Sequence, residues 1–287
     1  MTDALAAVPR SPWRDARVRL LRNRAAVVAI FVLGAIAAAC ILVPSFAQWP
    51  LDEVDWSSIQ APPSAEHLLG TDGNGRDLLV RIFYGGRISL TLGLAATLVA
   101  VVIGVAWGAT AGYVGGAVDG LMMRAVDVLY ALPFMFFVIL LMVFFGRDVV
   151  LMFVALGAVS WLDMARIVRG QTLTLKRREF VRAAHAMGAR PIAVVARHIV
   201  PNLLGPVAVF ATLTVPRVIL FESLLSFLGL GVQEPMTSWG VLISEGARAM
   251  ETSPWMLLFP AAILAATLFA LNFIGDGLRD ALDPRDH

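Results

Sequence analysis

Long, mostly apolar segments with few or no charges recur along this chain, and they decide which fold class it can adopt. Residues 25–43 form the first such segment and contain no charged residue. A helix of about 20 mostly apolar residues crosses the hydrocarbon core of a bilayer, so this segment is a candidate transmembrane helix. Five further candidates follow at residues 88–112, 125–145, 149–168, 203–221 and 255–274. Hydrophobic residues make up 59% of the chain and charged residues only 15%, whereas about a quarter of residues are charged in soluble domains. We therefore predict an all-α integral membrane protein with six transmembrane helices.

The distribution of arginine predicts how these helices are oriented. Residues 1–24 contain six arginines and only two aspartates, and basic residues stay on the cytoplasmic side of a membrane. We expect a cytoplasmic basic tail at 1–24, a first transmembrane helix at 25–43 and an extracytoplasmic segment at 44–86. A five-helix core follows at 87–275 and includes a second outer segment at 229–254. The last residues, 276–287, form a cytoplasmic tail. A cleaved signal peptide is the competing interpretation, but its apolar part is only about 7–15 residues long.

A polar, basic island at residues 176–206 lies in a loop, at about residues 166–202, that the same rule places in the cytoplasm. We predict a short amphipathic helix here, beginning near Lys176 and ending near Met187, with Glu179 in its first turn and Gly188 as a left-handed cap before Pro191. Four apolar residues recur at the spacing of one helix face: Phe180, Ala183, Ala184 and Met187. This spacing alone leaves open whether the helix lies on the membrane surface or docks into a groove of another protein.

A glycine-rich tract in the first outer segment predicts an ordered turn. Its distinctive residues are Gly70, Thr71, Asp72, Gly75, Arg76 and Asp77. The tract lacks the Glu that ends a calcium-binding EF-hand loop, and it lacks the Lys and Ser/Thr that close a phosphate-binding loop. We expect hydrogen bonds between its aspartates and arginines to hold the turn together.

Two charged residues, Arg217 and Glu222, interrupt the fifth apolar segment. Ionisable groups inside membranes are costly and often functional. Counting from Leu203 places both residues near the outer boundary, where they can meet water or each other. They either line a translocation path or have a structural role at its outer mouth.

Other patterns concern packing. Small residues four apart predict a close helix contact along Gly104, Gly108 and Gly112. Pro133 predicts a kink in the third span. Trp239 and Trp255 suit the aromatic belt at a membrane interface.

The sequence lacks the residues that several classes of function require. The histidines are too scattered to form a metal site, the single Cys40 cannot form an internal disulfide, and the net charge of +2 does not indicate nucleic-acid binding. No phosphate-binding glycine loop precedes Lys176, so we expect no ATP hydrolysis by this chain. An ion-coupled carrier usually has midplane charges and an internal repeat, and an intramembrane enzyme needs facing catalytic groups. Neither pattern is apparent, which favours a transport subunit powered by other proteins.

Five segments carry a family resemblance. Glu179, Ala183, Ala184 and Gly188, followed by Ile199 and Pro201, resemble the EAA loop of the membrane subunits of bacterial ATP-binding-cassette importers. The others resemble the dipeptide, oligopeptide and nickel permease family: GTDGNGRD from Gly70, SFLGLG from Ser226, SWG from Ser238 and LNFIGDGLRDALDP from Leu271. The resemblance covers about residues 70–284. Within the family, LPFMFFVILL from Leu132 and ILFESLLSFLGLG from Ile219 are most similar to the oligopeptide permease C subunits.

The resemblance implies an architecture and a set of partners. The architecture would be that of a type I importer permease in the bacterial inner membrane, importing oligopeptides, with dipeptides or nickel as alternatives. The short helix would be a coupling helix that docks on one of two ATP-binding subunits. Those subunits would bind ATP and Mg, and this chain would bind no cofactor. A homologous second permease subunit would complete the translocation path, and an extracytoplasmic peptide-binding protein would deliver the substrate.

Overall fold

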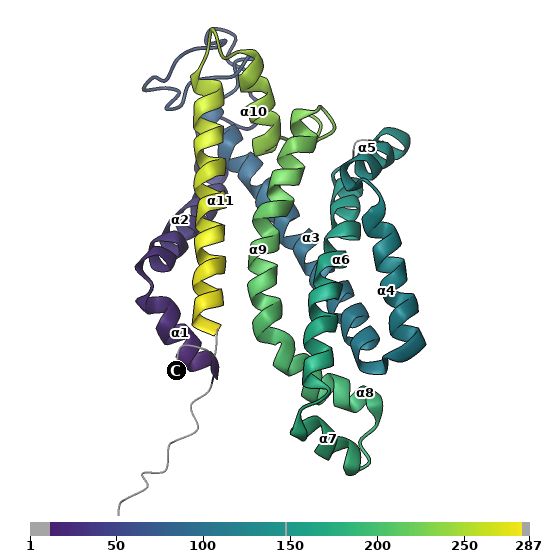
Figure 1. Cartoon of the computed structure of the whole chain (residues 1–287). Coiled ribbons are helices and arrows are strands. Elements are labelled where there is room, and N and C mark those ends of the chain that lie inside the picture. The colour runs from purple at the N-terminus through teal and green to yellow at the C-terminus, as the bar shows by residue number, and fades with distance from the viewer. Residues whose placement is uncertain (1–11, 147, 283–287) are drawn as a thin grey trace, which may run out of the picture.

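The computed structural model describes residues 12–146 and 148–282, which form helices and connecting loops without a named β-strand in that part of the chain (Figure 1). In chain order the helices are α1 (Pro12–Arg22), α2 (Arg24–Phe46), α3 (Leu78–Val114), α4 (Gly116–Ala131), α5 (Phe134–Phe145), α6 (Val149–Leu175), α7 (Glu179–Ala186), α8 (Pro191–Val194), a π-helical segment (Val195–Ile199), α9 (Val200–Phe227), α10 (Trp239–Arg248) and α11 (Trp255–Leu282).

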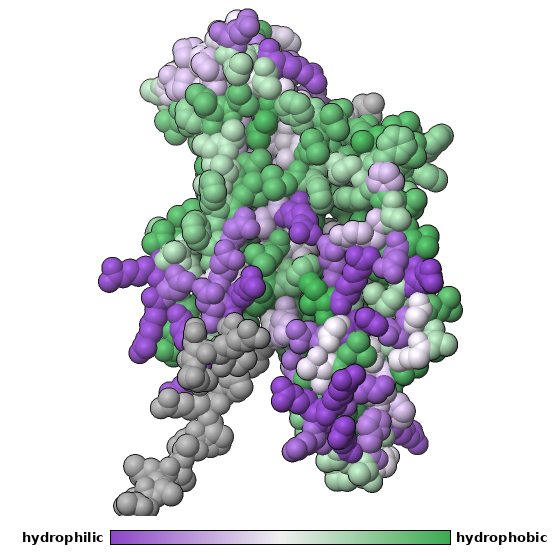
Figure 2. All heavy atoms as spheres, in the orientation of Figure 1, coloured by the Kyte–Doolittle hydropathy of each residue, from purple (hydrophilic) through white to green (hydrophobic). Residues whose placement is uncertain are grey.

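Among the described residues, five helices are long and apolar enough to cross a membrane: α2, α3, α6, the continuous helix Pro191–Phe227, and α11. The pair α4 and α5, which is bent by 75°, is a sixth if both helices belong to one span. In Figure 2, hydrophobic residues dominate the upper half of the molecule below a hydrophilic tip, whereas hydrophilic residues gather around α1 and over α7 and α8. The predicted all-α membrane fold is confirmed.

The third span is broken rather than kinked. The sequence predicted a single helix at residues 125–145, but α4 ends at Ala131 and α5 begins at Phe134 after an extended Leu132 and Pro133. Proline has no N–H to continue the helix, and it disfavours helical geometry at the preceding residue. These two effects explain why the chain turns here.

α3 begins well before the span expected at residues 88–112. The Asp77 carboxylate caps this helix by accepting a hydrogen bond from the Val80 backbone N–H at 3.0 Å. Arg87 marked the expected helix start because it is charged, yet it lies within α3. Its guanidinium donates to two backbone carbonyls near the end of α2, at 2.5 Å each. The last part of the proposed outer segment 44–86 is therefore helical.

The predicted glycine seam joins α3 to α6. A Cβ atom on Gly104 would lie 2.5 Å from the Met164 Cβ, and one on Gly108 would collide with the Ala165 carbonyl and lie 2.9 Å from the Arg169 backbone nitrogen. Real Cβ atoms do not approach other atoms so closely, so only glycine lets the two backbones meet. The packing prediction for this face is confirmed.

The short helices and the longest loop lie at the two ends of the molecule. α1, α7, α8 and the end of α11 lie at one end, while α10 and the loop that precedes α3 lie at the other (Figure 1). Trp239 belongs to this second end but does not form an aromatic belt, because it is completely buried and its indole N–H donates to the Ile82 carbonyl at 3.0 Å. It is a core residue that ties α10 to α3.

Candidate functional site

The short helix α7 ends as predicted but starts later. Lys176 is the C-terminal cap of α6, and α7 begins at Glu179. Gly188 has a φ of +79°. Its N–H donates to the His185 carbonyl at 2.9 Å, and the Ala189 N–H donates to the Ala184 carbonyl at 3.1 Å. These two bonds form a Schellman motif, which favours glycine at the left-handed position.

The two sides of α7 have different environments. Val181 and Ala184 are buried and pack in a hydrophobic cluster with α6 and the helices that follow α7. Phe180, Ala183 and Met187 face outward, and the Met187 side chain is 81% exposed. We call these three residues the outer face of α7. The predicted apolar face is therefore wrong at Ala184, because the helix rests on the bundle with that residue turned inward.

Hydrogen bonds attach α7 to the end of α3. The Tyr113 hydroxyl and the His185 Nε2 are 3.0 Å apart, and their rings stack with centroids 5.9 Å apart. The Lys176 ammonium donates to the Tyr113 carbonyl and lies 5.5 Å from the centroid of its ring. These contacts connect α7 and the end of α6 to α3, which is long and apolar enough to cross a membrane.

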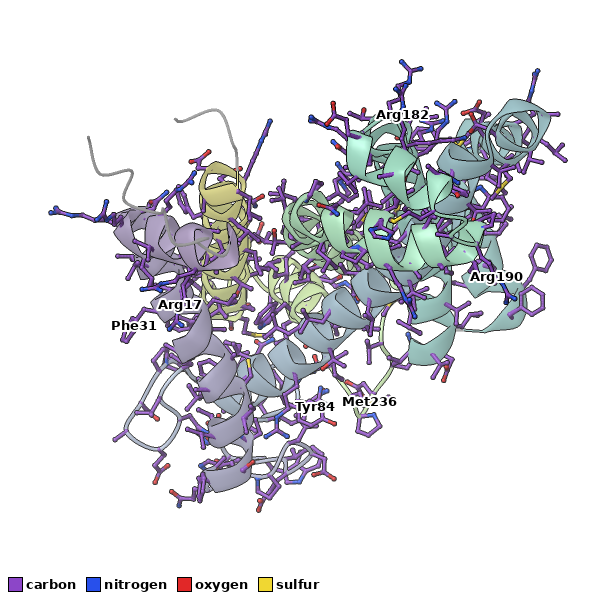
Figure 3. The ribbon with its side chains drawn as sticks, turned by 90° about the horizontal axis from the view of Figure 1, so that it is seen from below. Arg17, Phe31, Tyr84, Arg182, Arg190 and Met236 are labelled. Carbon is purple, nitrogen blue, oxygen red and sulfur yellow. The ribbon has the colours of Figure 1, made fainter. Side chains whose placement is uncertain are left out.

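Basic side chains surround the outer face of α7. Arg178 and Arg182 are exposed beside it, and Arg190 is exposed just after Gly188. Figure 3, viewed from below, shows Arg182 and Arg190 on the α7–α8 part of the molecule and Arg17 apart from them on α1. This end of the molecule therefore combines a small apolar surface with a positively charged rim.

At the opposite end, the glycine-rich tract forms an ordered turn. The Asp72 carboxylate accepts hydrogen bonds from the backbone N–H groups of Asn74 and Arg76, at 2.8 and 2.9 Å, and from the Arg76 Nε at 2.8 Å. Thr71 and Asp77 form an isolated antiparallel bridge that closes the turn. The predicted hydrogen bonding between aspartate and arginine is present.

Two glycines of this turn have left-handed backbones in tight surroundings. Gly70 and Gly75 both have a φ of +79°. A Cβ on Gly70 would lie 2.6 Å from the Ala61 carbonyl oxygen, and a Cβ on Gly75 would collide with the Asp55 carbonyl. Both conformation and space therefore require glycine at these positions.

Arginines connect this turn to the segments around α10. Arg81, only 1% exposed, pairs with Asp72 and also with Glu245 on α10, where its Nη1 is 2.7 Å from a carboxylate oxygen. Arg76 donates to Glu234 at 2.8 Å. Burial of Arg76 disfavours its charge, but hydrogen bonds to Glu234 and Asp72 outweigh this effect and hold its pKa above the ordinary value. A network of charged hydrogen bonds thus holds this end of the molecule together.

Arg217 and Glu222 do not meet, and Glu222 does not reach water. α9 extends to Phe227, beyond the span expected at residues 203–221. Glu222 is 0% exposed, whereas the Arg217 side chain is 58% exposed and pairs with Asp163 of α6 at 2.8 Å. The expectation that both lie near water at the outer boundary is therefore wrong for Glu222.

Serine hydroxyls surround the buried Glu222 carboxylate. The Ser226 hydroxyl donates to its Oε1 at 2.7 Å and the Ser89 hydroxyl to its Oε2 at 3.0 Å. The Ser89 hydroxyl also accepts from the Trp239 backbone N–H at 3.3 Å. This cluster joins α3, α9 and α10 inside the bundle, and it gives Glu222 a structural role.

We expect Glu222→Leu to destabilise the protein strongly, because it leaves buried hydroxyls without their acceptor, at about 1–3 kcal/mol for each unpaired group. Glu222→Gln is the matched control, since its side chain has a similar shape and retains one oxygen acceptor. Thermal unfolding of the detergent-purified protein measures the effect. Equal melting temperatures for Glu222→Leu and the wild type would show that the cluster does not hold these helices together.

Arg217 and Asp163 border a groove of about 430 Å³ where the α4–α5 break meets α6 and α9. Tyr130, Phe134 and Phe221 contribute to its lining, and the Phe134 and Phe221 rings pack edge to face with centroids 5.2 Å apart. Arg217 was singled out from the sequence but its partner Asp163 was not, because no local pattern pairs residues that lie in different spans. The only available signal was that each interrupts an otherwise apolar helix.

Known proteins are similar in sequence to this chain over nearly its whole length. Residues 100–285 match the family described as the binding-protein-dependent transport system inner membrane component, and residues 11–63 match the N-terminal transmembrane domain of oligopeptide transport permease C. The chain is 58% identical to the oligopeptide transport system permease protein OppC of Escherichia coli (strain K12), over 96% of this chain and 92% of that protein. It is 43% identical to OppC of Bacillus subtilis (strain 168), with coverages of 96% and 90%.

The dipeptide transport system permease protein DppC of Bacillus subtilis is also similar, at 43% identity over 95% of this chain and 85% of that protein. These matches confirm the family resemblance carried by the five sequence segments. The chain belongs to the family of binding-protein-dependent transport system inner membrane components.

Proposed function

We propose that this chain is a permease subunit of an ATP-driven importer that takes up oligopeptides across the bacterial inner membrane. Identity of 58% to an oligopeptide transport permease supports the substrate class. The match over residues 100–285 to an inner membrane transport component supports the role of the chain. ATP and Mg belong to two partner subunits, while a homologous second permease and an extracytoplasmic peptide-binding protein complete the importer.

The packing of α7 on the helix bundle is the observation that carries this proposal. Its inner side is fixed to the bundle through Val181 and Ala184, and its outer face is apolar and exposed. A small residue at the centre of that face, Ala183, lets a partner backbone approach closely, and Phe180 and Met187 serve as flanking anchors. A short helix of this kind docks in a cleft of an ATP-binding subunit and passes that subunit's movement to α3 through Tyr113.

The opposite end of the molecule receives the peptide from the binding protein. The turn at Gly70–Asp77 and α10 form a surface there that charged hydrogen bonds hold rigid. The groove beside Arg217 lies between these two ends, on α4, α5, α6 and α9. We assign this groove to the half of the translocation path that this subunit contributes.

Uptake measurements test the proposed function. A bacterium that lacks its own oligopeptide permease subunit receives this chain together with its cognate partners, and import of a radiolabelled tripeptide is followed. Uptake is expected to require this chain, the ATP-binding subunits and the binding protein, and an excess of unlabelled oligopeptide should compete better than unlabelled dipeptide. Uptake that continues after the ATP-binding subunits are removed would contradict the proposal and favour an ion-coupled carrier.

Cysteine labelling tests the proposed topology. In a Cys40→Ala background, which removes the single native cysteine, a cysteine replacing the 80% exposed Trp56 should react with a membrane-impermeant maleimide from outside. A cysteine replacing the exposed Arg190 should react only after the membrane is opened. The arginine distribution motivates this orientation, with both termini in the cytoplasm. The reverse labelling pattern would place α7 on the wrong side for an ATP-binding partner.

A further inference from the structure

The guanidinium of Arg217 has unused hydrogen-bonding capacity. A guanidinium carries five N–H donors, and Arg217 uses its Nη1 for a bond of 2.8 Å to one oxygen of Asp163. Within residues 12–146 and 148–282, no other hydrogen bond or ion pair to Arg217 is present. Its side chain is 58% exposed. Arg217 can therefore bind a second anionic group without first losing Asp163.

Apart from the Asp163 carboxylate, the surroundings of this charge are mostly apolar. Aromatic and aliphatic side chains, including Leu132, Phe134 and Phe221, line most of the groove, and charge–charge attraction is stronger beside apolar walls than in water. A planar guanidinium binds a carboxylate through two parallel hydrogen bonds. The groove volume of about 430 Å³ is in the range of small-molecule sites.

The broken third span adds backbone acceptors at the same place. α4 ends at Ala131 beside the groove, and the last carbonyls of a helix have no partner within it. In transporters, discontinuous helices present such groups to the substrate. The Leu129 carbonyl already accepts from the Leu132 N–H at 3.3 Å, so the carbonyls of Tyr130 and Ala131 remain as acceptors at the end of α4. The Arg217 guanidinium lines another part of the groove.

We propose that Arg217 binds the C-terminal carboxylate of the transported peptide during its passage, and that Asp163 positions the guanidinium and neutralises it when no peptide is present. This inference rests on the proposed function and assigns a substrate-binding residue to it. Every unmodified peptide has a terminal carboxylate whatever its side chains, so this contact suits import of many sequences. The apolar walls then accept variable side chains without requiring one of them.

A second ion pair marks the side of the groove that bears Tyr130. Arg166, one turn after Asp163 on α6, pairs with Asp127 at 2.8 Å and lies 4.1 Å from the centroid of the Tyr130 ring. Like Arg217, Arg166 is paired with one carboxylate, but its side chain is less exposed, at 37% against 58%. Arg166 therefore serves as an internal comparison for a charge in a stable pair.

Paired peptides and paired variants test the assignment in the assembled importer. One tripeptide is used with a free C-terminal carboxylate and with that carboxylate amidated, and uptake is measured for the wild type and for Arg217→Gln, Arg217→Lys and Arg166→Gln. Each rate is divided by the wild-type rate for the same peptide, so that discrimination by the binding protein cancels. Membrane levels and co-purification of the partner subunits show that each variant assembles.

Arg217→Gln is expected to lower uptake of the free peptide about tenfold to a hundredfold, as lost charged hydrogen bonds do, while changing uptake of the amidated peptide less than about twofold. Arg217→Lys keeps the charge without the bidentate geometry, so its loss should be smaller but still specific to the free carboxylate. If Arg217→Gln fails to assemble, Arg217→Lys provides the same comparison. Arg166→Gln should affect both peptides equally.

Two results would overturn the assignment. Equal losses for the free and the amidated peptide in the Arg217 variants would show that the pair only holds α6 to α9. The double variant Asp163→Arg with Arg217→Asp reverses the two charges. If it restored wild-type uptake, the pair would likewise have only a structural role. Absence of peptide uptake by the assembled wild-type importer would instead overturn the proposed function, and the Arg217 assignment with it.

Discussion

A cell carrying Ala183→Arg is expected to lose peptide uptake while the membrane domain remains folded. Ala183 is exposed at the centre of the outer face of α7, so an arginine there has room in the isolated subunit. In the complex it brings an unpaired charge into a docked apolar surface, which costs on the order of 3 kcal/mol or more. This corresponds to about a hundredfold weaker docking. Co-purification of the ATP-binding subunits and uptake in the same cells measure the effect.

Choosing Ala183 rather than its neighbour Ala184 makes this test specific for docking of α7. Ala184 is only 2% exposed and packs in the interior of this chain, so an arginine there damages the bundle whether or not α7 docks. Ala183→Ser is the matched control, because it keeps a small side chain and should retain both uptake and partner binding. If α7 lay on the membrane surface, Ala183→Arg would be neutral or favourable, since anionic lipids attract added positive charge. Normal partner binding by Ala183→Arg would therefore contradict docking through this face.

Gly108→Leu is expected to abolish accumulation of the folded protein. Even a Cβ at this position would collide with the Ala165 carbonyl and lie 2.9 Å from the Val168 Cβ, and the rest of a leucine side chain lies farther into α6. Overpacking by a single methylene group typically costs about 1–3 kcal/mol, and here backbone atoms of two spans must separate. Fluorescence-detected size-exclusion chromatography of membrane extracts measures the folded fraction.

Gly34→Leu is the control for this experiment. Gly34 also lies within a candidate membrane-spanning helix, α2, but apart from the neighbouring backbone of its own helix no described atom lies within 4 Å of the position of its missing Cβ. Its leucine variant should accumulate as the wild type does, since leucine favours a helix more than glycine does. A monodisperse Gly108→Leu protein at wild-type levels would show that the contact between α3 and α6 is looser than the structure indicates.

The sequence was sufficient where a local rule decides the structure. Gly188 was expected to be left-handed because a helix that ends before a proline commonly closes with glycine, and it is. The glycines of α3 were expected at a packing seam because their spacing places them on one helix face, and α6 lies there. Each of these predictions depends on residues within a few turns of one another.

The sequence was insufficient where the answer depends on distant parts of the chain. Helical spacing placed Ala184 with Met187, but which side of α7 faces the bundle depends on the Tyr113–His185 contact, formed across 72 positions. The depth of Glu222 was misjudged because hydropathy counting ends a helix at a charge. Ser226 lies one turn after Glu222 on α9 itself, but Ser89 comes from α3, and no local pattern shows the contact between the two helices.

Site-specific crosslinking from α7 tests the central claim most directly. Met187 is 81% exposed on the outer face, and a cysteine replacing it in a Cys40→Ala background can carry a thiol-linked photoreactive benzophenone. In the assembled importer, illumination should join this chain to an ATP-binding subunit, and the yield should change when ATP is added, because docking follows the ATP cycle. The same probe at Trp56, at the opposite end of the molecule, should give no such product. Crosslinking of the Met187 probe to lipid alone, in a complex that still imports peptide, would contradict the account.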